Sequence, residues 1–301
     1  MEQSDGLHEG RAAETLGLGF IGAGRLGTAL AWSFAARGCR VRAVASRSAP
    51  ASARLAARIP GCGVASPQDV AAGCDLIFVT TPDDAIADLA EGLRWRAGTG
   101  VVHCSAVTEV AALAKAARDG ALTGGFHPLQ TFADPARAVR ALPGSTITIE
   151  AEEPLNGILV ALATRLDCAV NRLPSGARGR YHAAAGYGSQ FVHVLLREAA
   201  KISRSWGMSE DDTVRAFLPM LRGTLAAIEG AGIAPSMPGP VSRGDVASIA
   251  KHVAALAALD GDILDLYRQL CRRTIPLAEE RGVIDAATAA RIREALFRSP
   301  G

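Results

Sequence analysis

The chain has 301 residues, of which 49% are hydrophobic and 21% are charged, so it can form a sizeable core and is long enough for two domains. Its formal net charge of +2 gives no electrostatic reason to expect a nucleic acid or a membrane surface as partner. No apolar run approaches the ~20 residues that cross a bilayer. The six scattered cysteines contain no C-x-x-C pair, which argues against a disulfide framework or a zinc site. Residues 1–14 are polar and lack a signal peptide. We therefore expect a cytoplasmic protein with a disordered N-terminal tail over residues 1–14 and no metal.

The first predicted elements are a strand, a glycine-rich turn, a helix and a second strand over residues 16–48. An apolar run ends in the turn, and a helical pattern continues from Thr28 to a stop at Gly38. The spacing G-x-G-x-x-G has a mechanical reason: the first glycine permits a tight turn, the second lets a pyrophosphate approach the backbone, and the third lets helix and strand pack closely. The start of the helix then offers free N–H groups to the phosphates. We therefore predict that a dinucleotide binds to Gly22, Ala23, Gly24, Arg25, Leu26 and Gly27. The other interpretation is a glycine-rich turn in a different kind of α/β protein.

The residues that follow the second strand indicate which dinucleotide binds. An NAD site has Asp or Glu at this point to accept hydrogen bonds from the ribose. This chain instead has Ser46, Arg47 and Ser48, with no carboxylate nearby. Two hydroxyls and a guanidinium suit a 2′-phosphate, and Arg25 in the turn could add a second positive charge. We therefore predict NADP(H) rather than NAD(H); the alternative is that Arg47 is a solvated loop residue.

From residue 49 to residue 172, strand-like runs alternate with helical segments, which predicts a mostly parallel sheet covered by helices. One strand is followed by Thr80, Thr81 and Pro82, which we expect beside the cofactor. After residue 172 the periodic segments are helical and no strand signal appears. The predicted fold class is α/β: an N-terminal Rossmann doubly wound sheet over residues 15–172, then an all-α C-terminal domain over residues 173–301 for substrate binding and dimerisation.

Four further residues are candidates for chemistry. Ser105 and His127 are predicted to lie at the ends of parallel strands, where ligands bind in such sheets. His127 would exchange the proton that accompanies hydride transfer, with Ser105 and His182 as orienting partners. Arg243 would clamp a substrate carboxylate with its planar fork of donors.

Each candidate also has a structural interpretation. Ser105 could be a cap or turn residue, and His127 a structural histidine. His182 could be an interior histidine bonded to a carbonyl, and Arg243 could form a local ion pair with Asp245. Gly124 and Gly125 precede His127 and indicate a close approach to the backbone at this point.

Five motifs in this order resemble one family: GLGFIGAGRLGTAL, VTTPDDAI, GFHPLQTF, YHAAA and GPVSRGD. The chain resembles bacterial Rossmann-like NADP oxidoreductases that carry a C-terminal helical domain of uncharacterised function. That family is similar in architecture to pyrroline-5-carboxylate reductase, ketopantoate reductase and prephenate dehydrogenase, which implies a homodimer formed through the helical domain. The likeness to prephenate dehydrogenases implies that Ser105 and His127 hold and polarise a hydroxyl or carbonyl. The chain departs from the family at Gln190, where an asparagine is usual.

These observations together predict an NADP(H)-dependent oxidoreductase. Hydride would pass to or from a C=O or C=N carbon of a small, carboxylated substrate. Two alternatives stay open from the sequence: a non-catalytic redox sensor that binds NADP(H), and a flavin- or deazaflavin-linked NADP reductase.

Overall fold

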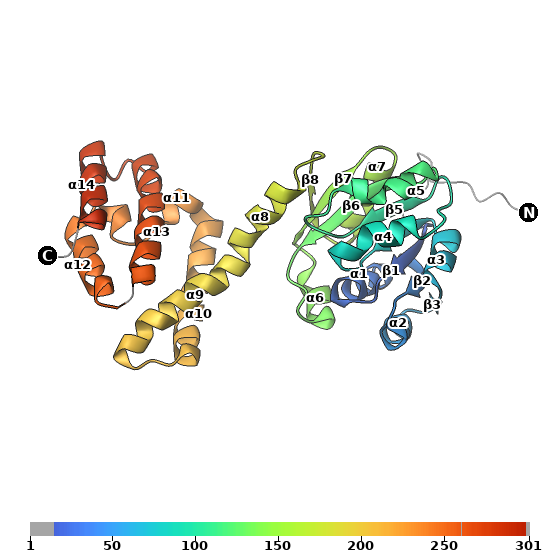
Figure 1. Ribbon diagram of the computed structural model, residues 1–301, viewed down its shortest axis with the longest axis horizontal. Helices are drawn as coiled ribbons and strands as arrows, with labels where there is room; N and C mark the ends of the chain where they lie inside the picture. Colours follow the sequence, from blue (N-terminus) through green and yellow to red (C-terminus); the bar gives the residue numbers. More distant parts are fainter. Residues whose placement is uncertain (1–14, 260, 299–301) are drawn as a thin grey trace, which may run out of the picture. The chain divides into compact units, whose positions relative to one another are not determined.

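The computed structural model describes residues 15–259 and 261–298, and the chain divides into two compact units between Ser189 and Gln190. The strands belong to the first unit, and the described part of the second unit is helical (Figure 1). The predicted fold class, a Rossmann-type sheet followed by an all-α part, is therefore confirmed. The predicted tail over residues 1–14 lies outside the described residues.

The first unit is built on one eight-stranded sheet with the order β3-β2-β1-β4-β5-β6-β7-β8. Neighbouring strands are parallel except for β6 and β7, which pair antiparallel. The chain crosses from one side of β1 to the other between β3 and β4, as in doubly wound folds. The strands are β1 Gly17–Ile21, β2 Arg40–Ala45, β3 Gly63–Val64, β4 Leu76–Val79, β5 Gly100–His103, β6 Leu122–Leu129, β7 Thr146–Ala151 and β8 Ala169–Arg172.

Helices cover both faces of this sheet (Figure 1). Residues of α1, α2 and α7 pack in the cluster on one face, and residues of α3, α4 and α5 pack in the cluster on the other. The α-helices are α1 Arg25–Ala36, α2 Ala49–Ala56, α3 Pro67–Gly73, α4 Ile86–Glu91, α5 Ala114–Arg118, α6 Pro135–Ala141, α7 Leu155–Arg165 and α8 Arg178–Gly188. Two 3₁₀ turns, η1 Asp83–Ala85 and η2 Val110–Leu113, precede α4 and α5.

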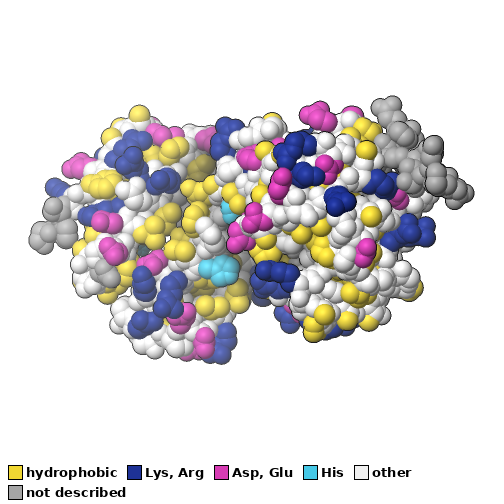
Figure 2. Space-filling model, turned by 45° about the vertical axis from the view of Figure 1, so that its right-hand side comes forward, with side chains coloured by type: hydrophobic (Ala, Val, Ile, Leu, Met, Phe, Trp, Pro, Cys, Tyr) yellow, Lys and Arg dark blue, Asp and Glu magenta, His cyan; other side chains and the backbone are white. Residues whose placement is uncertain are grey.

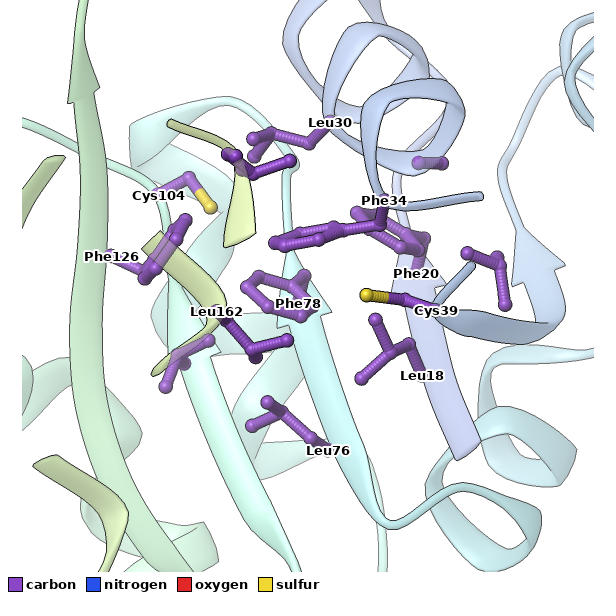
Figure 3. Packing of buried hydrophobic residues seen from close by; sticks show 14 of the residues in the cluster. Leu18, Phe20, Leu30, Phe34, Cys39, Leu76, Phe78, Cys104, Phe126 and Leu162 are labelled. Atoms are coloured by element: carbon purple, nitrogen blue, oxygen red, sulfur yellow. The ribbon is translucent and has the colours of Figure 1, made fainter. Parts of the chain in front are cut away.

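Four phenylalanines fill the centre of the core between α1 and the sheet (Figure 3). The ring of Phe78 on β4 lies 5.1 Å from that of Phe20, 5.3 Å from that of Phe34 and 5.4 Å from that of Phe126, measured between centroids. All four side chains are fully buried. Burying such rings contributes roughly 1.5–3 kcal/mol each, so this cluster fixes α1 and the glycine turn against β4.

The second unit consists of helices and short 3₁₀ turns in its described residues. Two of its helices, α10 and α13, contain a proline in their interior. The apolar pattern of residues 246–267 is that of a single helix, but the structure ends α12 at Ala257 and begins α13 at Gly261. The elements are α9 Gln190–Ser203, η3 Arg204–Trp206, α10 Glu210–Ala231, α11 Ile233–Ser236, η4 Val241–Arg243, α12 Val246–Ala257, α13 Gly261–Glu280 and α14 Ala286–Phe297.

The division between the units lies 17 residues later than the predicted boundary after residue 172, since the sequence offers no sign that α8 packs on the sheet. Two side chains of α8 explain the difference. Arg178 is buried against β7, and Tyr181 is hydrogen-bonded to β6. The apolar pattern of residues 182–204 is that of a continuous helix, but Ser189 leaves the helical conformation between α8 and α9.

Candidate functional site

The glycine turn has the geometry that a dinucleotide site requires. Gly22 has a φ of 121°, a conformation that favours glycine, and a Cβ at Gly27 would lie 2.4 Å from the Gly22 carbonyl oxygen. A Cβ at Gly24 would meet no atom within 4 Å, so the space over this residue is open. Gly24 is the N-cap of α1 and provides no capping side chain, and no acidic residue lies in the first turn. The helix start can therefore receive a phosphate.

The residues after β2 are arranged around the start of α2. Ser48 is the N-cap of that helix and its hydroxyl accepts a hydrogen bond from the Ala51 N–H, while the Ser46 hydroxyl accepts one from the Ser48 N–H. Arg47 is exposed and forms no hydrogen bond or ion pair within the described part of the chain. A pocket of about 550 Å³ lies between α1 and α2, and three arginines line it: Arg25, Arg54 and Arg58.

The three residues predicted to bind the cofactor after β4 differ in burial and hydrogen bonding. The Thr80 hydroxyl donates to the Gly22 carbonyl oxygen at 2.8 Å, so it holds the glycine turn in place. The Thr81 hydroxyl is buried and has no hydrogen-bond partner in the described part of the chain, whereas Pro82 is exposed. A buried hydroxyl without a partner is costly, so Thr81 is the better placed of the three to bind a ligand. Of the remaining turn residues, Ala23 and Leu26 are partly buried against the core and Arg25 is exposed.

A histidine and a tyrosine form the polar centre of the candidate active site. His127 Nδ1 lies 2.7 Å from the Tyr181 hydroxyl, and the two rings meet edge to face. His127 does not end its strand as predicted: β6 runs on to Leu129, because Phe126, His127 and Pro128 pair with β7. It nevertheless lies two residues beyond the last pair between β5 and β6, His103 with Gly125, and so beyond the carboxyl end of β5.

Burial and nearby charge keep this pair in its uncharged form. Burial, the Arg178 charge and His182 lower the pKa of His127 from 6.5 to about 4. Burial raises the pKa of Tyr181, against opposing effects of a hydrogen bond with Thr148 and the Arg178 charge. At neutral pH the site therefore holds a neutral imidazole beside a protonated phenol.

A pocket of about 560 Å³ opens beside this pair, between β6 with its following loop and α8. His182 is exposed and lines the pocket, so it is not the interior histidine of the alternative interpretation. The other polar groups of the lining are Gln130, Thr131 and Ser189, together with His127 and Tyr181. No lysine or arginine belongs to the described lining, which leaves the recognition of a carboxylate to some other part of the molecule.

Ser105 and Arg243 are placed differently from what their predicted roles require. The Ser105 hydroxyl accepts from the backbone N–H groups of Val107 and Thr108 and donates to the Thr108 hydroxyl, so it serves as the turn residue of the alternative interpretation. Arg243 is exposed on η4 of the second unit, and the pocket described above belongs to the first. Its neighbour Asp245 is the predicted N-cap of α12 and accepts from the Ser248 N–H.

Three functional residues were missed by the sequence analysis. Tyr181 entered the sequence analysis only as the first residue of the YHAAA motif, although it is the direct partner of His127. Arg178 and Glu150 form a buried ion pair behind that site. The pair of glycines before His127 was the available signal, since it predicted a close approach to the backbone, and Gly125 is indeed covered by the Arg178 guanidinium.

Two family models match the chain. Residues 1–128 match a Rossmann-like domain, and residues 145–274 match a domain of unknown function, DUF2520. The chain therefore matches a Rossmann-like domain over its first part and the DUF2520 domain over its second, each over less than half of its length. The DUF2520 match begins before β7, so it includes the last two strands and α8 and contributes Tyr181 to the site. The resemblance found in the sequence is thereby confirmed.

Solved structures share this fold over most of the chain. A candidate NADP oxidoreductase from Bacteroides fragilis is 25% identical, with a TM-score of 0.67, and the match covers 88% of this chain and 100% of the other. Protein TM1727 from Thermotoga maritima is 22% identical, with a TM-score of 0.74 and coverage of 88% and 99%. A reductive aminase from Aspergillus terreus, in complex with NADPH and ethyl-5-oxohexanoate, is 18% identical, with a TM-score of 0.62 and coverage of 92% and 98%. No curated protein matches this chain.

The described helices include none that is both long and apolar enough to cross a membrane. The described residues also contain no group of three or more His, Cys, Asp or Glu that could hold a metal ion. Basic and acidic side chains are interspersed on the face shown in Figure 2.

The two buried histidines of the site predict a pH dependence of stability. Burial, followed by the Arg178 charge, lowers the pKa of His103 to about 3, and His127 titrates near 4. The unfolded chain binds both protons near pH 6.5, so between pH 6.5 and about 4 the unfolded state holds more protons than the native state. As the pH is lowered through this range, the unfolding free energy should therefore decrease by up to about 1.4 kcal/mol per pH unit for each histidine.

Urea unfolding at pH 6.5, 5.5 and 4.5 measures this slope. His103→Leu should reduce the slope by up to half, since one of the two histidines is then absent. Carboxylates with lowered pKa values, such as Glu153 and Asp212, begin to add to the slope below about pH 5, so the interval from pH 6.5 to pH 5.5 isolates the histidines. An unchanged slope in His103→Leu would mean that His103 is already protonated in the native state.

Proposed function

We propose that this protein is an NADPH-dependent oxidoreductase that reduces a C=N or C=O carbon of a small molecule. The observation that carries the proposal is the hydrogen-bonded pair of His127 and Tyr181. It lies beside an open pocket of the unit that also contains the glycine turn. Ligands of doubly wound folds bind beyond the carboxyl ends of the strands, which is where both features lie. The Bacteroides oxidoreductase and the NADPH complex of the reductive aminase support the cofactor and the reaction class.

The residues of the glycine turn fit the cofactor. The open space over Gly24 admits a pyrophosphate, and the uncapped start of α1 offers it N–H groups. Thr81, whose hydroxyl lacks a partner in the described chain, is positioned to bind the cofactor after β4. The 2′-phosphate is assigned to Arg47, with Ser46 and Ser48 beside it, and the arginines of the pocket between α1 and α2 add positive charge.

The Arg47→Ala variant tests this phosphate site. A hydrogen bond to a charged group contributes about 1.5–3 kcal/mol, so the Kd of NADPH should rise by roughly 10- to 100-fold. The Kd of NADH should not change, because NADH has no 2′-phosphate. Arg94→Ala, on an exposed loop residue, is the matched control for loss of charge. Equal effects on both cofactors would reassign Arg47 to a structural role.

NADPH, when bound, would supply the hydride for the substrate carbon. The remaining requirement is a proton for the nitrogen or oxygen of the reduced group, and the Tyr181 hydroxyl can donate it. In the tautomer with a proton on Nδ1, His127 donates to the phenol oxygen and stabilises the negative charge that develops there. One hydride and one proton then complete the reduction, and solvent returns the proton to the phenol.

The test of the function is a substrate panel with the full-length protein. NADPH oxidation is followed at 340 nm with cyclic imines, 2-keto acids, ketone and amine pairs, and free flavins, each with and without a carboxylate. Turnover of an imine or carbonyl supports the proposal. Turnover of flavins alone would favour a flavin-linked reductase, and NADPH binding without any turnover would favour the redox sensor.

We also propose that the protein is a homodimer formed through α9 and α10. Helix α10 has 22 residues, and Thr213 is its buried residue. Helices of proteins gain most of their stability from packing, so an uncovered helix of this length requires a partner. Its exposed apolar residues, together with those of α9, are Leu218, Met220, Leu225, Ile228, Phe191, Val194 and Leu195.

The sequence of α10 is complementary to itself, which favours a second copy as that partner. Consider two antiparallel α10 helices related by a two-fold axis between Leu225 and Ala226. Arg222 then faces Glu229 of the partner subunit, and Ile228 faces Gly223 of the partner subunit, so opposite charges meet and large residues face small ones.

Light scattering after gel filtration should give twice the mass of the 31.1 kDa chain. Leu225→Arg should shift the protein to the monomer, because it places two like charges at the two-fold axis. Leu270→Arg, on an equally apolar exposed position of α13, is the control that should leave the dimer intact. A monomeric wild-type protein at micromolar concentration would overturn the proposal.

A further inference from the structure

A row of paired residues crosses four neighbouring strands behind the proposed active site. Val79 on β4 pairs with His103 on β5, His103 pairs with Gly125 on β6, and Gly125 pairs with Glu150 on β7. Residues paired across strands project from the same face of a sheet. The side chains of His103 and Glu150 therefore stand on either side of a gap that Gly125 leaves open.

The guanidinium of Arg178 fills this gap. A Cβ on Gly125 would lie 1.6 Å from Arg178 Nη2, so any other residue at position 125 would displace the arginine. Arg178 Nε donates to Glu150 Oε2 at 2.5 Å, and Nη1 donates to the Ser105 carbonyl oxygen at 2.7 Å. The whole side chain is buried, and Nη2 has no hydrogen-bond partner in the described chain.

The buried position of the Arg178 guanidinium is energetically unfavourable for a cation, for two reasons. Arg178 begins α8, and the positive end of a helix dipole repels a positive charge. Removing a guanidinium from water costs several kcal/mol, which Glu150 offsets through a close ion pair. Packing alone would be served better by an apolar pair of similar volume.

The position of Arg178 on α8 determines where the pocket residues lie. Residues three and four positions apart share one face of a helix, so fixing Arg178 on the sheet directs Tyr181 and His182 toward β6. The Tyr181 hydroxyl consequently meets Nδ1 of His127, which stands on the same face of β6 two residues after Gly125. The ion pair thus sets the alignment of the proton donor against the histidine.

The same guanidinium acts on the charge of the histidine. The titratable groups around His127 are His103 from β5, Glu150 from β7, and Arg178, Tyr181 and His182 from α8. Besides burial, the Arg178 charge lowers the pKa of both His127 and His103. Its effect on the imidazole is thus added to that of the low-dielectric surroundings.

We propose that Arg178, seated in the Gly125 gap and held by Glu150, is a positioning residue that aligns Tyr181 with His127 and places a fixed positive charge beside the imidazole, so that tyrosine carries the transferred proton. This inference rests on the proposed function, because a proton is transferred only if the protein catalyses the proposed reduction. The arrangement of charge that it describes can be tested without any substrate or cofactor.

The test is an NMR titration of the imidazole of His127 in the full-length protein, assigned with a His127→Gln variant. In the Arg178→Met/Glu150→Gln double variant both charges are removed without leaving a buried ion, and the titration midpoint of His127 should rise by at least one pH unit. In Glu150→Gln alone the guanidinium keeps its charge, so the midpoint should stay the same or fall. Arg180→Met, an exposed position on the same helix, should leave it unchanged.

The role proposed for Arg178 differs from simple support of α8 in one result. The His127 midpoint should rise in Arg178→Met/Glu150→Gln but not in Glu150→Gln. Loosening of the helix would expose His127 to water in both variants and raise both midpoints together, and that outcome would overturn the proposal. No change in the double variant would also overturn it. Once a substrate is known, the double variant should lose at least tenfold in kcat with an unchanged Kd for NADPH. If no substrate is reduced, the titration still decides whether Arg178 controls the histidine.

Discussion

Replacing Tyr181 by phenylalanine should lower kcat for the proposed reduction by about 10²- to 10⁴-fold, the range that a general acid contributes. The variant keeps the ring that packs edge to face on His127 and removes the hydroxyl that lies 2.7 Å from Nδ1. The Kd of NADPH should not change, because the glycine turn and the residues after β2 are untouched. Stopped-flow measurement of NADPH oxidation, with fluorescence titration of NADPH binding, separates the two quantities.

The companion variant is His127→Asn, which can still donate a hydrogen bond to the phenol oxygen but cannot titrate. If tyrosine is the proton donor, His127→Asn should lose less activity than Tyr181→Phe. The reverse order, with a loss of less than tenfold in Tyr181→Phe, would return the role of proton donor to His127, as the sequence alone predicted. The pH dependence adds a check: a histidine that titrates near pH 4 predicts no acid limb between pH 5 and 7 in the wild type.

The parts of the fold that the sequence predicts are those encoded by local rules. The glycine turn and the stop at Gly38 each depend on backbone geometry within a few residues, and both are confirmed. Alternating strands and helices are likewise enough to predict a doubly wound sheet. The sequence did not show that β6 and β7 pair antiparallel, and this pairing is what places His127 inside a strand.

The candidate site depends on contacts that no local rule describes. Arg178 and Glu150 are separated by 28 positions, and neither charged residue stands out in a chain that contains 62 charged residues. Their ion pair forms in the space above Gly125. That space depends on the register of β5, β6 and β7 and on the packing of α8 against them. The histidine was predictable because ligands of doubly wound sheets bind beyond the carboxyl ends of the strands, whereas its partner required the tertiary structure.

Breaking the buried ion pair from one side should destabilise the protein strongly. Glu150→Leu leaves the Arg178 guanidinium buried without its partner, and such a change costs about 3–5 kcal/mol of unfolding free energy. In Glu150→Leu/Arg178→Met, both charges are replaced by apolar groups, and most of that loss should be regained. Glu91 provides the matched control: its ion pair with Arg118 is exposed, with 60% and 65% of the two side chains accessible, so Glu91→Leu should cost no more than about 1 kcal/mol. Urea unfolding at pH 7 measures all three variants. Similar losses of stability in Glu150→Leu and Glu91→Leu would mean that the Arg178 guanidinium is hydrated or binds another group in the variant. The ion pair with Glu150 would then not determine the position of α8.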